Sequence, residues 1–334
     1  MKICIERSDR MGDMILTLPI IKGIKEKNPN ATIDVVASKK NLKICQLSHL
    51  INTTYEKTNN SKAFEQLTKS IRQEQYDYYF SFSPSWFGLL LGYYSQSKLK
   101  SALILQSRYK SNFLSKFWHI IFSKIFFSQS KVVNRFKSLR ENQNIHQTKM
   151  MMDVILNSGI NLDKNIKSEF TFTNAFTIEK DNKVCVIHLS SKWINKYYEE
   201  DNFLELLKVL QNKNLSIYLT SDETTKSKFH KIFTLYPSTD KSSDLIKNDK
   251  QILLCNNFDF ENWTSLLNQA DYTITPESGC THIASLTSSK LCVIYDADNL
   301  PKSIMHEYAP WNKEYLALET SDHDLNKKLL NFIE

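Results

Sequence analysis

Residues 2–38, KICIERSDRMGDMILTLPIIKGIKEKNPNATIDVVAS, carry the pattern that decides the fold. The apolar run KICIE predicts a strand, and the apolar residues of 14–27 recur at helical spacing. Asp13 stands at the start of that helix, where the helix dipole favours an acid, and an Asn-Pro pair ends it. TIDVVAS predicts the next strand. This alternation predicts an α/β fold with a parallel sheet and helices on both faces.

The second half of the chain repeats the alternation. Strands are expected at 184–190, 215–221, 251–256, 271–276 and 291–296, and helices at 203–213, 224–236, 261–270, 281–288 and 322–334. A length of 334 residues suits two domains of about 150 residues each. We therefore expect domains at 1–160 and 183–334, joined by a polar hinge at 161–182, with a last helix able to pack back on the first domain.

Composition argues against several classes of protein. The six glycines form neither G-x-G-x-x-G nor G-x-x-x-x-G-K-[ST], which disfavours the fingerprint dinucleotide folds and the P-loop NTPases. No apolar run reaches the ~18 residues of a membrane-spanning helix, and the first residues lack the apolar stretch of a secretory signal. The six cysteines show no C-x-x-C or zinc spacing, so we expect buried free thiols in a reducing cytoplasm.

Charge is distributed unevenly along the chain. The net charge is +7, but residues 1–150 hold 24 Lys and Arg against 10 Asp and Glu, a balance of +14. Between Asp77 and Glu141 there is no acidic residue and there are ten basic ones. Such a block predicts an anionic partner for the first half. No recognised nucleic-acid motif accompanies the charge, so nucleic acid is not the expected partner.

Polar residues follow four of the expected strands, and ligands of open α/β sheets bind beyond the carboxyl ends of strands. The candidate residues are Asp13, then Ser190, Ser191 and Lys196, then Glu223, and finally Glu277, Ser278, Gly279 and His282. Hydroxyls and a lysine in one loop suit a phosphate, and a helix N-terminus after Gly279 is a ready anion site. Taken singly, each place also fits a helix-capping acid, an ordinary polar loop or a core histidine.

Together these places resemble glycosyltransferase family 9, the bacterial lipopolysaccharide heptosyltransferases. Residues 7–19, RSDRMGDMILTLP, resemble that family's R-x-x-x-x-G-D-x-x-x-x-x-P. HLSSKWINKYY at 188–198 resembles its lysine loop, and TPESGCTHIAS at 275–285 resembles T-[NP]-D-[ST]-G-x-x-H-[LIV]-A, with Glu277 in place of the aspartate. YAPW at 308–311 resembles a proline–tryptophan element near the end of the family pattern.

The resemblance implies a GT-B architecture, with two Rossmann-like domains whose parallel sheets face each other across a cleft. The first domain would bind the acceptor and the second the nucleotide sugar. The implied reaction is an inverting transfer, typically of heptose from ADP-heptose to the inner core of a lipid A precursor. It would need no cofactor and no metal, and it would occur at the cytoplasmic face of the bacterial inner membrane, where the enzyme is peripheral.

The resemblance also implies roles for the candidate residues. Asp13 would be the base that activates the acceptor hydroxyl. Lys196, Ser190 and Ser191, with the turn formed by Glu277, Ser278 and Gly279, would meet the charge of the diphosphate. His282 would add a hydrogen bond, and Glu223 would hold the ribose.

The acid-free block at 78–140 contains YKSNFLSKFWHIIFSKIFF. As a helix it is basic, aromatic and suited to an anionic membrane surface through Lys110, Lys116 and Lys124. A core helix with solvated lysines is the alternative. For the whole chain, the alternative is a non-catalytic nucleotide-sugar-binding GT-B paralogue, whereas Gly12-Asp13 argues against a sugar epimerase.

Overall fold

The computed structural model describes residues 1–110, 114–141, 143, 145–179, 182–190, 200–246, 251–297 and 300–333. They form two compact units. The N-terminal unit comprises Met1–Thr171 and His306–Trp311, and the C-terminal unit comprises Phe172–Met305 and Asn312–Glu334. The division after Thr171 falls inside the segment 161–182 that the sequence offers as a hinge.

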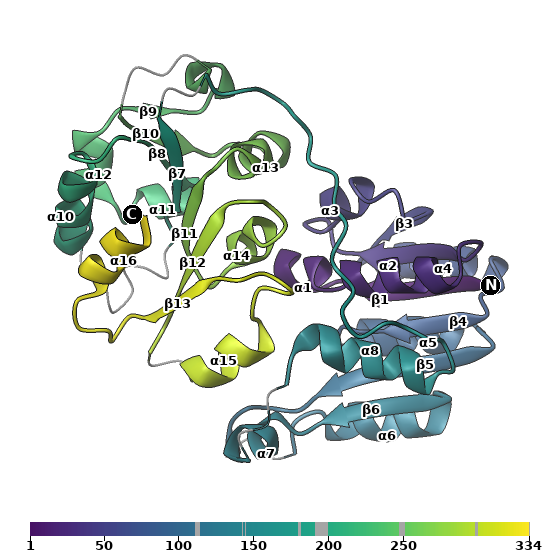
Figure 1. Ribbon diagram of the computed structural model, residues 1–334. Coiled ribbons are helices and arrows are strands. Elements are labelled where there is room, and N and C mark those ends of the chain that lie inside the picture. Colours follow the sequence, from purple (N-terminus) through teal and green to yellow (C-terminus); the bar gives the residue numbers. More distant parts are fainter. Residues whose placement is uncertain are drawn as a thin grey trace. The chain divides into compact units, whose positions relative to one another are not determined.

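The N-terminal unit is built on a six-stranded parallel sheet with the order β3-β2-β1-β4-β5-β6 (Figure 1). Its strands are β1 (Lys2–Arg7), β2 (Thr32–Ala37), β3 (Thr53–Glu56), β4 (Tyr78–Ser81), β5 (Leu99–Leu105) and β6 (Gln129–Val133). Its helices are α1 (Met11–Ile15), α2 (Leu18–Lys27), α3 (Leu42–Gln46), α4 (Ser61–Gln73), α5 (Trp86–Tyr94), α6 (Phe117–Phe126), α7 (Arg135–Arg140) and α8 (Gln147–Asn157). Helices pack on both faces, as expected.

The helix predicted at 14–27 is two helices, α1 and α2. Pro19 lies in the first turn of α2. Because proline has no backbone N–H, it cannot donate to the carbonyl of Ile15, and a continuous helix would lose that bond. The break shortens α1 to a single turn that carries Asp13.

The C-terminal unit has a seven-stranded parallel sheet with the order β13-β12-β11-β7-β8-β10-β9. Its strands are β7 (Lys183–His188), β8 (Leu215–Ser221), β9 (Ser238–Thr239), β10 (Ile252–Asn256), β11 (Tyr272–Pro276), β12 (Lys290–Tyr295) and β13 (Leu316–Glu319). Its helices are α10 (Glu200–Leu210), α11 (Glu223–Lys226), α12 (His230–Leu235), α13 (Phe260–Asn268), α14 (Gly279–Ala284), α15 (Pro301–Glu307) and α16 (Leu325–Ile333), with a 3₁₀ helix at Ser242–Leu245. The five predicted strands are present, and the predicted helix at 224–236 is divided into α11 and α12.

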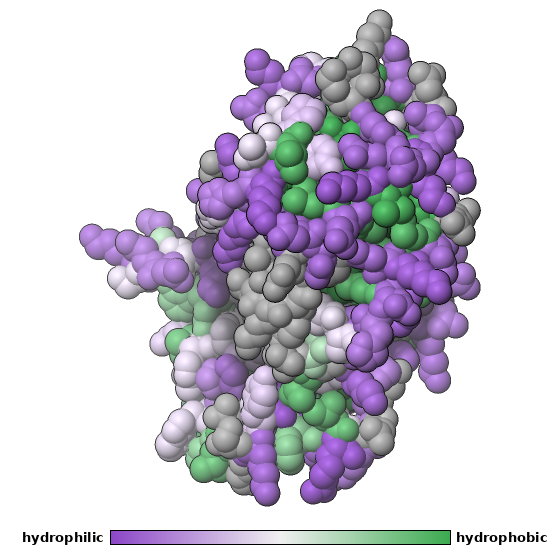
Figure 2. Space-filling view, turned by 90° about the vertical axis from the view of Figure 1, so that its left-hand side faces the viewer, coloured by the Kyte–Doolittle hydropathy of each residue, from purple (hydrophilic) through white to green (hydrophobic). Residues whose placement is uncertain are grey.

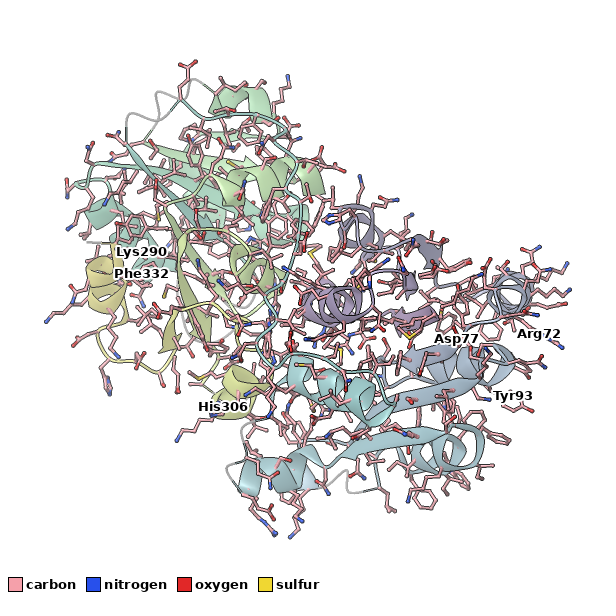
Figure 3. The ribbon with its side chains drawn as sticks, turned by 45° about the vertical axis from the view of Figure 1, so that its right-hand side comes forward. Arg72, Asp77, Tyr93, Lys290, His306 and Phe332 are labelled. Carbon is pink, nitrogen blue, oxygen red and sulfur yellow. The ribbon has the colours of Figure 1, made fainter. Side chains whose placement is uncertain are left out.

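The last helix, α16, packs on the sheet of its own unit, the C-terminal one. Leu325, Leu329 and Ile333 lie one turn apart along α16, and all three belong to the core of the C-terminal unit. The ring centroids of Phe332 and Tyr272 are 5.9 Å apart, and Lys290 Nζ lies 5.3 Å from the centroid of the Tyr272 ring. Lys290 and Phe332 lie close together in Figure 3.

Cysteine burial, helix length and surface hydropathy bear on the expectations from composition. All six cysteines are buried free thiols. Within the described ranges, no helix is both long enough and apolar enough to cross a membrane. The side of the molecule that carries α16 is mainly hydrophilic, with hydrophobic residues in smaller groups (Figure 2).

Glu6 and Asp34 are acidic residues buried in strands of the N-terminal sheet. Glu6 of β1 has no exposed surface. Its Oε1 accepts a hydrogen bond from Ser8 Oγ at 2.5 Å, and its Oε2 accepts one from Ser81 Oγ at 3.0 Å. Burial, with the nearby charge of Asp9, raises the pKa of Glu6 from 4.5 to about 7.

This shift predicts a pH-dependent stability. Between its unfolded pKa of 4.5 and its folded pKa of about 7, Glu6 binds more protons in the folded state. Its contribution to the free energy of unfolding therefore falls as the pH rises through this window. Glu6→Gln removes the titration, so the stability of the variant relative to wild type should improve by about 3 kcal/mol from pH 5 to pH 8.

Urea unfolding at both pH values measures this difference. Glu205→Gln, on the exposed face of α10, provides the same substitution without burial. If the relative stability of Glu6→Gln improves no more than that of Glu205→Gln, the raised pKa of Glu6 is contradicted.

Candidate functional site

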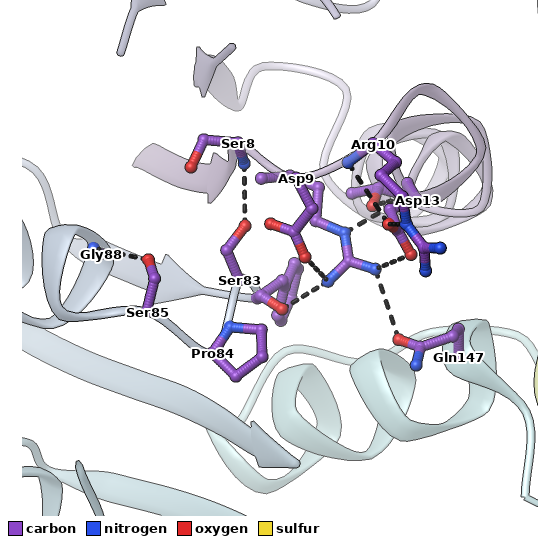
Figure 4. Close-up of polar contacts among 12 residues, drawn as sticks. Ser8, Asp9, Arg10, Asp13, Ser83, Pro84, Ser85, Gly88 and Gln147 are labelled. Carbon is purple, nitrogen blue, oxygen red and sulfur yellow. Dashed lines mark hydrogen bonds and ion pairs between the residues drawn. The ribbon is translucent and has the colours of Figure 1, made fainter. Parts of the chain in front are cut away.

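A cluster of charged residues lies at the carboxyl ends of β1 and β4 (Figure 4). Asp13 lies in the first turn of α1 and is only 4% exposed. Its Oδ1 accepts a hydrogen bond from Arg7 Nη2 at 3.0 Å. Its Oδ2 accepts hydrogen bonds from the backbone N and the Nε of Arg10, each at 3.3 Å. The expected position at a helix start is confirmed, and Asp13 is a buried carboxylate between two arginines.

Arg7 is the buried cation of this cluster, with 1% of its surface exposed. Its Nη1 donates to the carbonyl of Phe82 and lies 3.6 Å from Asp9 Oδ2, and its Nε donates to the backbone carbonyl of Asp13 at 3.3 Å. Burial opposes the charge, but the carboxylates of Asp9 and Asp13 more than offset it and raise the pKa of Arg7. Arg7 is therefore always charged, and it forms a buried ion pair with Asp13 at 3.0 Å. The sequence motif contains Arg7, but sequence reasoning gave it no role.

A pocket of about 330 Å³ lies beside the ends of β5 and β6 in the same unit. Its lining residues are Gln106, Ser107, Tyr109, Lys110, Asn134, Phe136, Lys137 and Arg140. Three of these side chains are cationic, and two are aromatic. Cations bind phosphate or carboxylate groups, and aromatic faces pack against sugar rings, so the pocket suits an anionic saccharide.

In the C-terminal unit, the turn from β11 to α14 holds four of the candidate residues. Ser278 caps α14, and its Oγ accepts a hydrogen bond from the backbone N of Cys280 at 3.2 Å. Glu277 lies directly after β11, and its backbone N donates to the carbonyl of Ile294 at 2.9 Å. His282 is buried in α14 with 2% of its surface exposed. The turn therefore places Glu277, Ser278 and Gly279 at the carboxyl edge of the sheet, with His282 packed behind them.

The other donor-side candidates are described in part. Ser190 lies two residues beyond β7, and Glu223 begins α11 after β8. The preceding residue, Asp222, caps α11 by accepting a hydrogen bond from the backbone N of Thr225 at 2.7 Å. Ser191, Lys196 and the side chain of Glu223 lie outside the described residues. Among the residues that are described, no group of three or more His, Cys, Asp or Glu side chains is placed to hold a metal ion.

Helices α5 and α6 carry an aromatic surface. Trp118 and Ile125 are 68% and 66% exposed, and Ser123 is the one buried residue of α6. Ring contacts join the two helices. The ring centroids of Tyr93 and Phe126 are 4.9 Å apart, and those of Trp86 and Phe122 are 5.5 Å apart. Ile120 and Phe122 pack against the core of the N-terminal unit, whereas Trp118 and Ile125 are exposed, so α6 has one face on the core and one on the surface.

The three lysines predicted near this surface differ in their environment. Lys110 and Lys124 are exposed. Lys116 instead donates from Nζ to the carbonyl of Pro84 at 2.6 Å, and burial lowers its pKa. Lys116 therefore has a local structural contact that Lys110 and Lys124 lack among the residues that the structure describes.

The comparisons with known proteins fit these observations. The pattern of glycosyltransferase family 9 (heptosyltransferase) matches residues 64–328. Lipopolysaccharide heptosyltransferase 3 of Escherichia coli K12 is 24% identical over 216 residues, which cover 63% of this chain and 60% of that protein.

Solved structures share the fold. E. coli ADP-heptose lipopolysaccharide heptosyltransferase II superposes with a TM-score of 0.74 at 12% identity, covering 100% of this chain and 97% of that one. E. coli heptosyltransferase WaaC with ADP gives 0.71 at 11% identity, covering 100% and 99%. The two parallel α/β units match the architecture of these heptosyltransferases, as the sequence motifs predicted. The chain belongs to glycosyltransferase family 9, the heptosyltransferase family.

Proposed function

We propose that this chain is an inverting glycosyltransferase that moves heptose from ADP-heptose onto the lipopolysaccharide inner core or a related glycolipid. The observation that carries the proposal is Asp13, held between Arg7 and Arg10 at the end of β1 within the family motif. Relatives support the choice of donor and acceptor. One is a lipopolysaccharide heptosyltransferase, and WaaC has been solved with ADP and with ADP-2-deoxy-2-fluoro heptose.

A sugar hydroxyl is a poor nucleophile and needs a base as it attacks. In the proposed reaction, the acceptor oxygen bonds to the anomeric carbon while its proton passes to Asp13. The bond from that carbon to the diphosphate breaks, and ADP leaves with the electron pair. Attack opposite the leaving group inverts the anomeric centre. Such general base catalysis contributes ~10²–10⁴-fold.

The charge that develops on the diphosphate needs compensation from the protein. We assign this role to Lys196, Ser190 and Ser191, with the turn at Glu277, Ser278 and Gly279. Glu223 would hold the ribose, and His282 would support the turn. With these groups in place, the proposed reaction needs no metal ion.

Asp13→Asn tests the base. Asparagine retains one oxygen that can accept from Arg7 Nη2, whereas its NH2 group cannot accept from Arg10. The substitution therefore removes the base and keeps the contact with Arg7. We expect kcat for transfer from ADP-heptose to fall ~10²–10⁴-fold, with ADP affinity unchanged in calorimetry. Asp163→Asn, which changes an exposed carboxylate, is the control. Turnover of Asp13→Asn near that of wild type would exclude Asp13 as the base. A wild-type protein that binds ADP-heptose without transfer would instead favour the non-catalytic paralogue.

Lys196→Ala tests the phosphate contact. One charge-assisted hydrogen bond is worth ~1.5–3 kcal/mol, so the Kd for ADP-heptose should rise about 10- to 100-fold. Lys327→Ala, an exposed lysine of α16, should leave the Kd unchanged. Chelation of metals by EDTA should not alter the wild-type rate. Equal affinities of Lys196→Ala and wild type would show that the phosphate site lies elsewhere.

A glycolipid acceptor is embedded in a membrane, and the aromatic surface of α5 and α6 suits an anionic leaflet. Tyr93 points away from the body of the N-terminal unit (Figure 3). Aromatic and aliphatic side chains favour the lipid interface, and the acid-free block supplies basic residues such as Lys110 and Lys124. We place the enzyme on the cytoplasmic face of the inner membrane, bound peripherally through this surface. The basic pocket beside β5 and β6 would then receive the anionic core saccharide.

Vesicle sedimentation tests this surface. Wild type should bind vesicles rich in phosphatidylglycerol at low salt and be released at high salt, because the Debye length falls from ~10 Å at 0.1 M to ~3 Å at 1 M. The double variant Trp118→Ser/Ile125→Ser should bind much less. Leu235→Ser, at a side chain that is 62% exposed on α12, is the matched control. Equal sedimentation of the double variant and wild type would exclude α6 as the membrane contact.

A further inference from the structure

Glu307 is a fully buried carboxylate in the segment His306–Trp311, which we call the return segment. Its Oε2 accepts hydrogen bonds from Arg108 Nε and Nη2 at 3.0 and 2.7 Å. Its Oε1 accepts hydrogen bonds from Arg135 Nη1 at 3.2 Å and from Gln147 Nε2 at 2.7 Å. Each carboxylate oxygen of Glu307 therefore accepts two hydrogen bonds.

Gln147 connects this carboxylate to the candidate base. It is fully buried at the start of α8. Its Oε1 accepts from Arg7 Nη2 at 3.3 Å (Figure 4). Its Nε2 donates to Glu307 at 2.7 Å. Arg7 Nη2 also donates to Asp13. One amide therefore joins the guanidinium beside Asp13 to the return segment.

Tyr308 provides a second connection. The guanidinium groups of Arg10 and Arg108 lie 5.5 and 5.6 Å from the centre of its ring, within the range of cation–π attraction. Arg10 donates to Asp13, and Arg108 donates to Glu307. The contacts therefore close into one ring, which runs through Asp13, Arg7, Gln147, Glu307, Arg108, Tyr308 and Arg10.

The return segment would be attached to the N-terminal unit even without the contacts that reach Arg7 and Arg10. Two arginines already neutralise Glu307, and Trp311 anchors the same segment by donating from Nε1 to the carbonyl of Ile166 at 2.7 Å. Buried polar networks are weak sources of stability compared with apolar packing, but they fix a unique geometry. The geometry fixed here is that of the two arginines that contact Asp13.

We infer that Gln147, Glu307 and Tyr308 are positioning residues for Asp13, holding Arg7 and Arg10 so that the carboxylate keeps one orientation. The inference rests on the proposed role of Asp13 as the base. The return segment is flanked on both sides by residues of the C-terminal unit, up to Met305 and from Asn312. The C-terminal part of the chain thus contributes two of the groups that orient the base in the N-terminal unit.

Steady-state kinetics of the full chain test the first connection. With ADP-heptose and a delipidated inner-core oligosaccharide, Gln147→Met should lower kcat by about 10- to 100-fold, since a misplacement of 1 Å can cost ~10²-fold. The KM for ADP-heptose should not change. Gln129→Met makes the same substitution at an exposed site on β6 and should match wild type.

A matched pair at Tyr308 tests the second connection without requiring activity. Arg7, Asp9, Arg10 and Tyr308 are charged or titratable groups that interact with Asp13. The Arg10 side chain is 71% exposed, so without the ring it should move away from the carboxylate. In ¹³C NMR titrations of the Asp13 carboxyl, Tyr308→Leu should raise the midpoint above that of wild type. Tyr308→Phe, which keeps the ring, should recover most of the wild-type behaviour.

The outcomes distinguish a failure of the proposed base from a failure of the positioning role. An active Asp13→Asn would refute the base itself, whatever the positioning variants do. An inactive Asp13→Asn together with wild-type kcat in Gln147→Met and an unmoved midpoint in Tyr308→Leu would overturn the positioning role. Circular dichroism and ADP binding confirm that each variant is folded. Lower thermal stability without a change in kcat or midpoint would assign these residues a structural role only and would also overturn the inference.

Discussion

The ion pair between Arg7 and Asp13 is the interaction on which the N-terminal site depends. Arg7 ends β1 in a buried position, where an unpaired charge would cost several kcal/mol. The carboxylates of Asp9 and Asp13 and the carbonyl of Phe82 surround its guanidinium. These contacts join β1 to β4 and fix the turn that begins α1. The same contacts orient the candidate base, so fold and chemistry share one constraint.

Two guanidinium groups beside a carboxylate favour its charged form and lower its affinity for a proton. As the proposed base, Asp13 is therefore held in one orientation by these two groups. That suits a displacement in which the acceptor hydroxyl becomes acidic only as it bonds to the anomeric carbon. In such a reaction the orientation of the base matters more than its basicity. The proposed role of Glu307, a buried residue distant in sequence, is to help hold Arg7 and Arg10 in place.

The sequence predicted what local patterns encode: the parallel sheets, most strands of the C-terminal half, Asp13 at a helix start and the turn at Glu277–Gly279. It did not predict the partners of Asp13 or the return segment. Gln147 and Glu307 are 160 residues apart, and no local period signals such a contact. The aromatic stripe of α6 left two interpretations open, because a core helix and an interfacial helix share one pattern. The structure shows that α6 packs Ile120 and Phe122 against the core and leaves Trp118 and Ile125 exposed.

The stereochemistry of transfer tests the central claim most directly. ¹H NMR of the anomeric proton compares the heptose in the ADP-heptose donor with the heptose in the product as it forms. Direct displacement assisted by one base, Asp13, predicts the opposite anomeric configuration in the product. A product with the configuration of the donor would require two displacements or a front-face reaction, and would contradict the account.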